Sequence, residues 1–132
     1  MGLKEYKLDL HIHTCLSPCA DVTMIPSAVM KEALSRNLDA VGICDHNSAG
    51  NVVAFKNAGK RFGVTVFGGM EITSSEEVHV LVYFDDNEAL FAMQESVHRT
   101  LQGENDVDLF GLQLLVDEDD TFTESEERLL IR

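Results

Sequence analysis

Basic side chains are scarce in this sequence. Its 132 residues include 10 Lys and Arg against 23 Asp and Glu, which gives a formal net charge of -13 at pH 7. A nucleic-acid backbone or an anionic membrane is therefore not an expected partner, because like charges repel. The imbalance is greatest after residue 84, where 3 basic side chains accompany 14 acidic ones.

Long apolar runs are also missing. No segment approaches the ~20 consecutive apolar residues that a membrane-spanning helix needs, and residues 1–6 lack the apolar stretch of a secretory signal. The hydrophobic content of 45% is nevertheless enough to bury a core. We expect a single domain over residues 1–132, located in the cytoplasm and not bound to a membrane.

Cysteine is rare, and the motifs of several enzyme classes are absent. Cys15, Cys19 and Cys44 are odd in number and lack the spacing of a disulfide framework, so we expect free thiols in a reducing compartment. There is no glycine-rich phosphate loop, no Gly-x-Ser-x-Gly elbow and no dinucleotide fingerprint. Nucleophilic-triad chemistry has no support.

Hydrophobic periodicity predicts alternating strands and helices, which is typical of βαβ units with a parallel sheet or barrel. Beyond Gly103 the pattern is weaker, and it indicates a strand, a turn and a capping box that opens a final helix. The expected strands are Tyr6–Ile12, Ala40–Cys44, Val64–Phe67, Val78–Phe84 and Phe110–Val116; the helices are Thr23–Asn37, Asn51–Phe62 and Asp86–Gln102; the turn is Asp117–Asp120 and the capping box Thr123-x-x-Glu126.

Two histidines, His11 and His13, end the first expected strand. Residues two apart on a strand point to the same side, so both imidazoles can reach one metal ion. His46 and Glu71 follow the next two expected strands, and in parallel α/β barrels the loops after the strands meet at one face. The Asp45-His46-Asn47 run would also serve as a helix cap.

Other candidates have competing interpretations. His79 lies within an apolar strand and needs a partner or a metal, whereas Asp21 suits either a ligand or a turn residue. His98, near a helix end, is better explained by the helix dipole. Cys15 and Cys19, beside the two histidines, offer a Cys2His2 zinc site as an alternative.

These residues resemble a known family. The motifs Asp9-Leu10-His11-Ile12-His13-Thr14, Asp21, Asp45-His46-Asn47, Gly69-Met70-Glu71-Ile72 and His79-Val80-Leu81 are similar, in order and spacing, to the N-terminal part of the PHP (polymerase and histidinol phosphatase) phosphoesterases. The resemblance runs from about Leu8 to Phe84.

The resemblance implies a distorted (β/α)7 barrel of mostly parallel strands with two or three divalent metals, variously zinc, manganese or iron. His11 and His13 would bind the first metal, and Glu71 would bridge it to a second that His79 also holds. Asp21 and His46 would bind a third, while Asp45 would orient a ligand from the second shell. Clustered metals would lower the pKa of a bridging water that hydrolyses a phosphoester or nucleotide.

The sequence also departs from the family pattern. Members carry later histidine and aspartate ligands that are not found here, and a full barrel needs roughly 200 residues. We therefore expect an incomplete barrel with little phosphatase activity, whose uncovered edge favours a homo-oligomer or exchange of the C-terminal segment. A non-catalytic metal-binding or interaction module is one alternative. An amidohydrolase is another, although no lysine follows Lys60 to bridge its metals.

Overall fold

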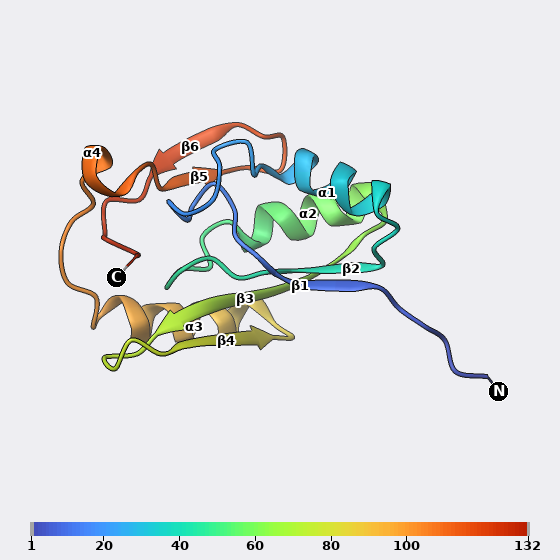
Figure 1. Cartoon of the computed structure of the whole chain (residues 1–132), viewed down its shortest axis with the longest axis horizontal. Coiled ribbons are helices and arrows are strands. Elements are labelled where there is room, and N and C mark those ends of the chain that lie inside the picture. The colour runs from blue at the N-terminus through green and yellow to red at the C-terminus, as the bar shows by residue number, and fades with distance from the viewer. Residues whose placement is uncertain (1, 132) are drawn as a thin grey trace.

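The computed structural model describes residues 2–131 and is built around a four-stranded sheet in the order β1-β2-β3-β4 (Figure 1). Its strands are β1 (Leu8–Ile12), β2 (Ala40–Ile43), β3 (Thr65–Thr73) and β4 (His79–Phe84). The first three are parallel, as the sequence predicts, whereas β4 runs antiparallel to β3. The fold is α/β with a mostly parallel sheet, and within residues 2–131 the sheet does not close into a barrel.

Helices cover one face of this sheet. α1 (Pro26–Ser35) and α2 (Val52–Phe62) pack together above β2 and β3, and α3 (Asn87–His98) contacts β3 and β4. The ends of α1 and α2 follow their sequence signals, because Asn37 and Gly63 adopt left-handed backbone angles, with φ of 57° and 75°. The core lies between the helices and the sheet.

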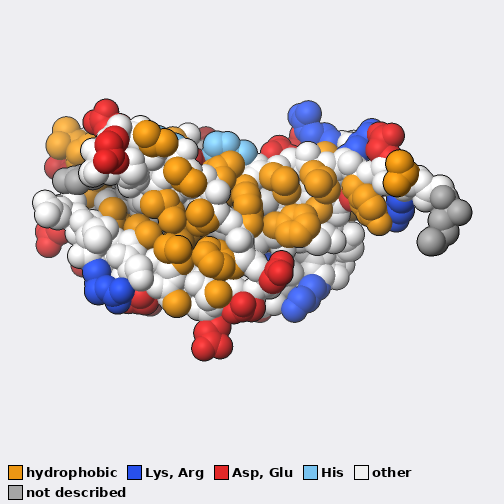
Figure 2. All heavy atoms as spheres, turned by 90° about the horizontal axis from the view of Figure 1, so that it is seen from below, with side chains coloured by type: hydrophobic (Ala, Val, Ile, Leu, Met, Phe, Trp, Pro, Cys, Tyr) orange, Lys and Arg blue, Asp and Glu red, His pale blue; other side chains and the backbone are white. Residues whose placement is uncertain are grey.

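The opposite face of the sheet has no helix over it among the described residues. The strand register places Phe67 of β3 and Leu81 of β4 on this face, and Leu8 of β1 lies there too. All three side chains are exposed. Figure 2, viewed from below, shows hydrophobic side chains gathered in a band beside histidine side chains. We refer to this surface as the open face. Self-association by pairing of an uncovered strand edge or by exchange of the C-terminal segment stays a prediction.

The C-terminal segment differs from the sequence-based expectation. The short helix α4 (Val107–Phe110) was not predicted, and the strand expected at Phe110–Val116 is reduced to β5 (Leu114–Val116). The capping box at Thr123-x-x-Glu126 does not open a helix. Instead β6 (Phe122–Ser125) pairs antiparallel with β5, because the turn at Asp117–Asp120 reverses the chain and supplies a partner strand.

Two buried asparagine side chains connect the C-terminal segment to the rest of the chain. Asn51 donates to the Leu114 carbonyl (3.1 Å) and accepts from the Val116 amide (3.0 Å). Asn47 donates to the Leu130 carbonyl (2.8 Å). The β5–β6 hairpin therefore packs on its own chain.

Two further observations bear on the sequence analysis. Cys15, Cys19 and Cys44 are all free thiols, as expected. Among the described residues, none of the helices combines the length and the apolar character that crossing a membrane requires.

Candidate metal centre

A bulge in β1 sets the direction of its two histidines. Leu8 and Asp9 pair with Ala40 and Val41, but Ile12 pairs with Ile43, so β1 contains one residue more than β2 over this stretch. An extra residue turns every later side chain to the other side of the sheet. Ile12 consequently packs into the core, and the histidines beside it face the open side.

Gly42 of β2 makes this bulge possible. A Cβ at this position would lie 2.7 Å from the Leu10 carbonyl oxygen and 2.9 Å from the Leu10 Cα, both backbone atoms of β1. The freed Leu10 carbonyl accepts a hydrogen bond from the hydroxyl of Tyr83 on β4. The Tyr83 ring reaches across Gly69 of β3, where a Cβ would lie 2.7 Å from the ring. Tyr83 and these glycines were not predicted as site residues, because only the pairing of distant strands brings them together.

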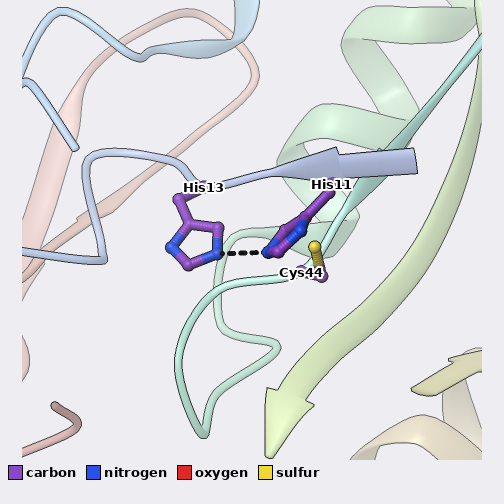
Figure 3. A group of neighbouring side chains, drawn as sticks. All are labelled: His11, His13 and Cys44. Atoms are coloured by element: carbon purple, nitrogen blue, oxygen red, sulfur yellow. Dashed lines mark hydrogen bonds between the residues drawn. The ribbon is translucent and has the colours of Figure 1, made fainter. Parts of the chain in front are cut away.

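The two histidines meet at their ring edges. Figure 3 shows His11 on β1 and His13 just after it, with the thiol of Cys44 nearby. The Nε2 atoms of His11 and His13 are 3.1 Å apart. The Cys44 thiol points at the Leu10 and Ile12 carbonyls at 3.8 Å, and burial raises its pKa to about 11.

Glu71 is the centre of the cluster. Its Oε2 lies 2.9 Å from His11 Nε2 and 2.7 Å from His13 Nε2, and its Oε1 lies 2.6 Å from His79 Nδ1. Glu71 is 6% exposed. It lies within β3, not beyond the strand end at Phe67 as predicted, because pairing with the antiparallel β4 extends β3 to Thr73. The same pairing brings His79 opposite Thr73 and within reach of Glu71.

The electrostatics of the cluster favour the ligand forms of both residue types. Burial alone would raise the pKa of the Glu71 carboxyl, but hydrogen bonds from His11 and His79 outweigh it and lower that pKa to about 2. Burial lowers the pKa of His46 to about 4, and the neighbouring His13 acts in the same direction. At neutral pH Glu71 is a carboxylate and His46 a neutral imidazole, which are the states that bind metals.

His46 joins the cluster from the loop after β2. Its ring centroid lies 4.5 Å from that of His13 and 5.6 Å from that of His79. Its backbone pairs with Glu71 in a parallel bridge, so the two loops are fixed to each other. The Nδ1 atom of His46 is buried and has no hydrogen-bond partner. A buried nitrogen without a partner requires an explanation.

Asp45 is a buried residue whose carboxylate joins two loops of the cluster. It is 1% exposed and accepts hydrogen bonds from the Thr14 amide (2.6 Å), the Thr14 hydroxyl (2.7 Å) and the Ser17 hydroxyl (2.7 Å). Burial raises its pKa. Through Thr14 and Ser17 it links the loop after His13 to the loop that carries His46. Sequence reasoning placed Asp45 beside a ligand but missed Thr14 and Ser17.

Asp21 and His98 lie apart from the ring cluster. Asp21 lines a hollow of about 520 Å³ together with His11 and His13, yet its carboxylate accepts from the amide and hydroxyl of Thr23 (2.8 and 2.7 Å). These bonds lower its pKa. His98 ends α3 and contacts the Asn47 carbonyl at 2.9 Å. Neither belongs to a described group of three ligand atoms within 4.8 Å of one another.

Three groups among the described residues do meet that spacing and could hold a metal ion. They are His11, His13 and Cys44; His13, Cys19 and His46; and His46, Glu71 and His79. The Cys2His2 alternative is not formed, because Cys15 is 1% exposed and packs in the core.

The chain is similar in sequence to several known proteins. The chain is 28% identical over 78 residues to a phosphoribosyl 1,2-cyclic phosphate 1,2-diphosphodiesterase of Eggerthella lenta, which covers 55% of this chain and 29% of that protein. It is 36% identical over 78 residues to an uncharacterised protein of Methanocaldococcus jannaschii, covering 53% and 46%. A 5′-3′ exoribonuclease of Haemophilus influenzae is 26% identical over 78 residues, covering 57% and 27%.

A solved structure is also similar. A protein of Bifidobacterium adolescentis described as a metal-dependent phosphoesterase matches with a TM-score of 0.55 and 28% identity, over 70% of this chain and 33% of that one. The chain spans less than half the length of each of these relatives. The family model for the PHP domain matches residues 9–130, and the chain belongs to the PHP domain family.

Proposed function

We propose that this chain carries the metal centre of a phosphoesterase, with two or three divalent cations held by His11, His13, His46, Glu71 and His79. The observation that carries the proposal is the position of the Glu71 carboxylate, within 2.9 Å of three imidazoles. Family membership and the phosphoesterase names among the relatives support the same activity.

The donor set fits a cation. Four imidazoles surround one carboxylate, and the buried Nδ1 of His46 has no partner in the protein. His11, His13 and Glu71 would hold one ion, and Glu71 with His79 would hold a second. Imidazole and carboxylate ligands admit zinc, manganese and iron.

The charge of the hollow indicates how phosphate would bind. Its lining includes Asp9 and Asp21 but no Lys or Arg. Without a metal this surface repels a phosphate group, and bound divalent cations would reverse the sign of the local field. When bound, such cations act as Lewis acids on a phosphoryl group and lower the pKa of a coordinated water. Phosphate binding should therefore depend on metal.

The chain's own residues have distinct tasks in this proposal. Glu71, buried and ionised, would supply negative charge to the bound cations. His46, whose pKa burial lowers to about 4, is neutral at pH 7 and would bind without neutralising that charge. Asp45 keeps the two histidine-bearing loops in fixed relation. The substrate class we propose is a small phosphoester or a nucleotide.

Metal-dependent hydrolysis and phosphate binding test the proposal together. Protein stripped with EDTA is reloaded with Mn²⁺ or Zn²⁺, and hydrolysis of bis(p-nitrophenyl) phosphate and binding of inorganic phosphate are measured. We expect phosphate binding, and the little hydrolysis that an incomplete barrel allows, to require metal and to be lost in Glu71→Gln. Glu77→Gln, a change at an exposed position in the β3–β4 hairpin, should leave both intact.

The same experiment separates the alternatives. A chain that binds metal but does not bind phosphate through it is a metal-binding module without a phosphoester site, and the proposal is then wrong. An amidohydrolase is not favoured, since Glu71 occupies the centre of the cluster and no lysine follows Lys60 in the sequence.

A further inference from the structure

Cys19 lies at the edge of the metal centre in a loop with a fixed shape. Its Sγ is 3.1 Å from Nδ1 of His13. The loop between β1 and α1 is held by the Ser17 hydroxyl, which donates to Asp45, and by the Ala20 amide, which donates to the Ser17 carbonyl at 2.9 Å. The thiol is therefore placed beside the histidines by its backbone, although the residue itself is exposed.

We propose that Cys19 is a thiolate ligand of a cation position formed with His46 and His13. This inference rests on the proposed function and adds a ligand to its metal centre. The three donor atoms lie within 4.8 Å of one another. His46, 7% exposed, brings a buried Nδ1 without a hydrogen-bond partner to the same cluster. Binding would release the thiol proton to solvent, and the ring N–H proton of His13 as well when His13 also binds the ion at Glu71 through its other nitrogen.

The observed spacing fits a shared ion. Zinc binds imidazole nitrogen at about 2.0–2.1 Å and thiolate at about 2.3 Å, so two ligands at a tetrahedral angle are roughly 3.5 Å apart. The 3.1 Å between Cys19 Sγ and His13 Nδ1 is close to this value. Sulfur also gives this position a different preference from the Glu71 position, because thiolate favours zinc whereas carboxylate also suits manganese.

Neither Asp21 nor Cys44 fills this role as well. Asp21 Oδ1 accepts both hydrogen bonds from Thr23, and among the described residues Asp21 is not in a group of three ligand atoms within 4.8 Å of one another. Cys44 lies near His11 and His13 (Figure 3), but it is fully buried and its thiol points at the Leu10 and Ile12 carbonyls. Cys19 is the exposed thiol of the three, with open access for an entering ion.

Cobalt spectroscopy tests the inference without relying on activity. Reduced, EDTA-treated protein is titrated with Co²⁺, whose visible bands report binding and whose near-ultraviolet band reports a sulfur ligand. We expect the sulfur band in the unmodified protein and in Cys44→Ser, and its loss in Cys19→Ser, where the visible bands persist. A sulfur band that survives in Cys19→Ser, or visible bands without any sulfur band in the unmodified protein, would overturn the inference and leave the proposed function standing. A protein that takes up no cobalt contradicts the proposed function itself.

A second measurement uses only the unmodified protein. Alkylation of Cys19 by iodoacetamide is followed by peptide mass spectrometry with and without excess Zn²⁺. We expect zinc to slow modification of Cys19 about tenfold or more, because a bound thiolate is a poor nucleophile. An unchanged rate at zinc concentrations that saturate the protein would show that the sulfur is not a ligand.

Discussion

Replacing Gly42 by alanine should damage the metal centre through the backbone of β1. The added Cβ would lie 2.7 Å from the Leu10 carbonyl oxygen, and must separate from it beyond the 3.0 Å below which real Cβ contacts are essentially never seen. The obstacle is backbone, so β1 itself has to move. Overpacking of this kind costs about 1–3 kcal/mol. The movement affects the bulge that turns His11 toward Glu71, where the two side chains are now 2.9 Å apart.

We expect Gly42→Ala to lower the free energy of urea unfolding by about 1–3 kcal/mol and the affinity for Zn²⁺ by about tenfold or more, as when the supports of metal ligands are removed. The matched control is Gly50→Ala, whose Cβ would meet only side-chain atoms, Leu115 Cδ2 at 2.5 Å being the nearest. Those atoms can move aside, so the control should bind zinc normally. Unchanged stability and zinc affinity in Gly42→Ala would refute the role assigned to the bulge.

Three further predictions concern the supporting groups. Asp45→Ala should destabilise the fold by about 3 kcal/mol or more in urea unfolding, because three buried donors lose their acceptor at about 1–3 kcal/mol each; a loss below 1 kcal/mol would contradict this. Burial lowers the pKa of His46 in the folded protein from the ordinary 6.5 to about 4, so as the pH falls the unfolded chain takes up this proton before the folded protein does. Stability of the metal-free protein should fall by about 3 kcal/mol between pH 6.5 and 4, and a flat profile in thermal unfolding would argue against it. Iodoacetamide should modify Cys19 well before Cys15 and Cys44, since both of the latter are buried with pKa values raised to about 11; equal rates by mass spectrometry would show that the core is open.

Local patterns predicted much of this structure. The order of strands and helices through α3 agrees with the prediction. Amphipathic periods and capping residues such as Asn37 and Gly63 act within a few residues of the chain, so the local sequence is enough to indicate them. The pairing of His11 with His13 likewise follows from their spacing. These features need no information from distant parts of the sequence.

The remaining features depend on contacts between distant segments. The antiparallel course of β4 follows from its tight hairpin with β3, a pairing that the expected parallel sheet did not specify. The bulge opposite Gly42 could not be seen in β1 alone, since it is defined by register with β2. The sequence does not show which of Cys15 and Cys19 lies near the histidines. In the fold Cys15 packs into the core, whereas Cys19, on the same loop, is exposed beside His13. The helix predicted from the capping box at Thr123 is wrong, because Thr123 lies in β6, which pairs with β5.

The most direct test of the account is an anomalous difference map from crystals grown with excess Zn²⁺ or Mn²⁺. The account predicts a strong peak between Glu71 and the imidazoles of His11 and His13, at about 2.0–2.2 Å from their ligand atoms, and no such peak in Glu71→Gln. A map without a peak at this cluster, from protein otherwise folded as described, would contradict the central claim that these residues form a metal centre.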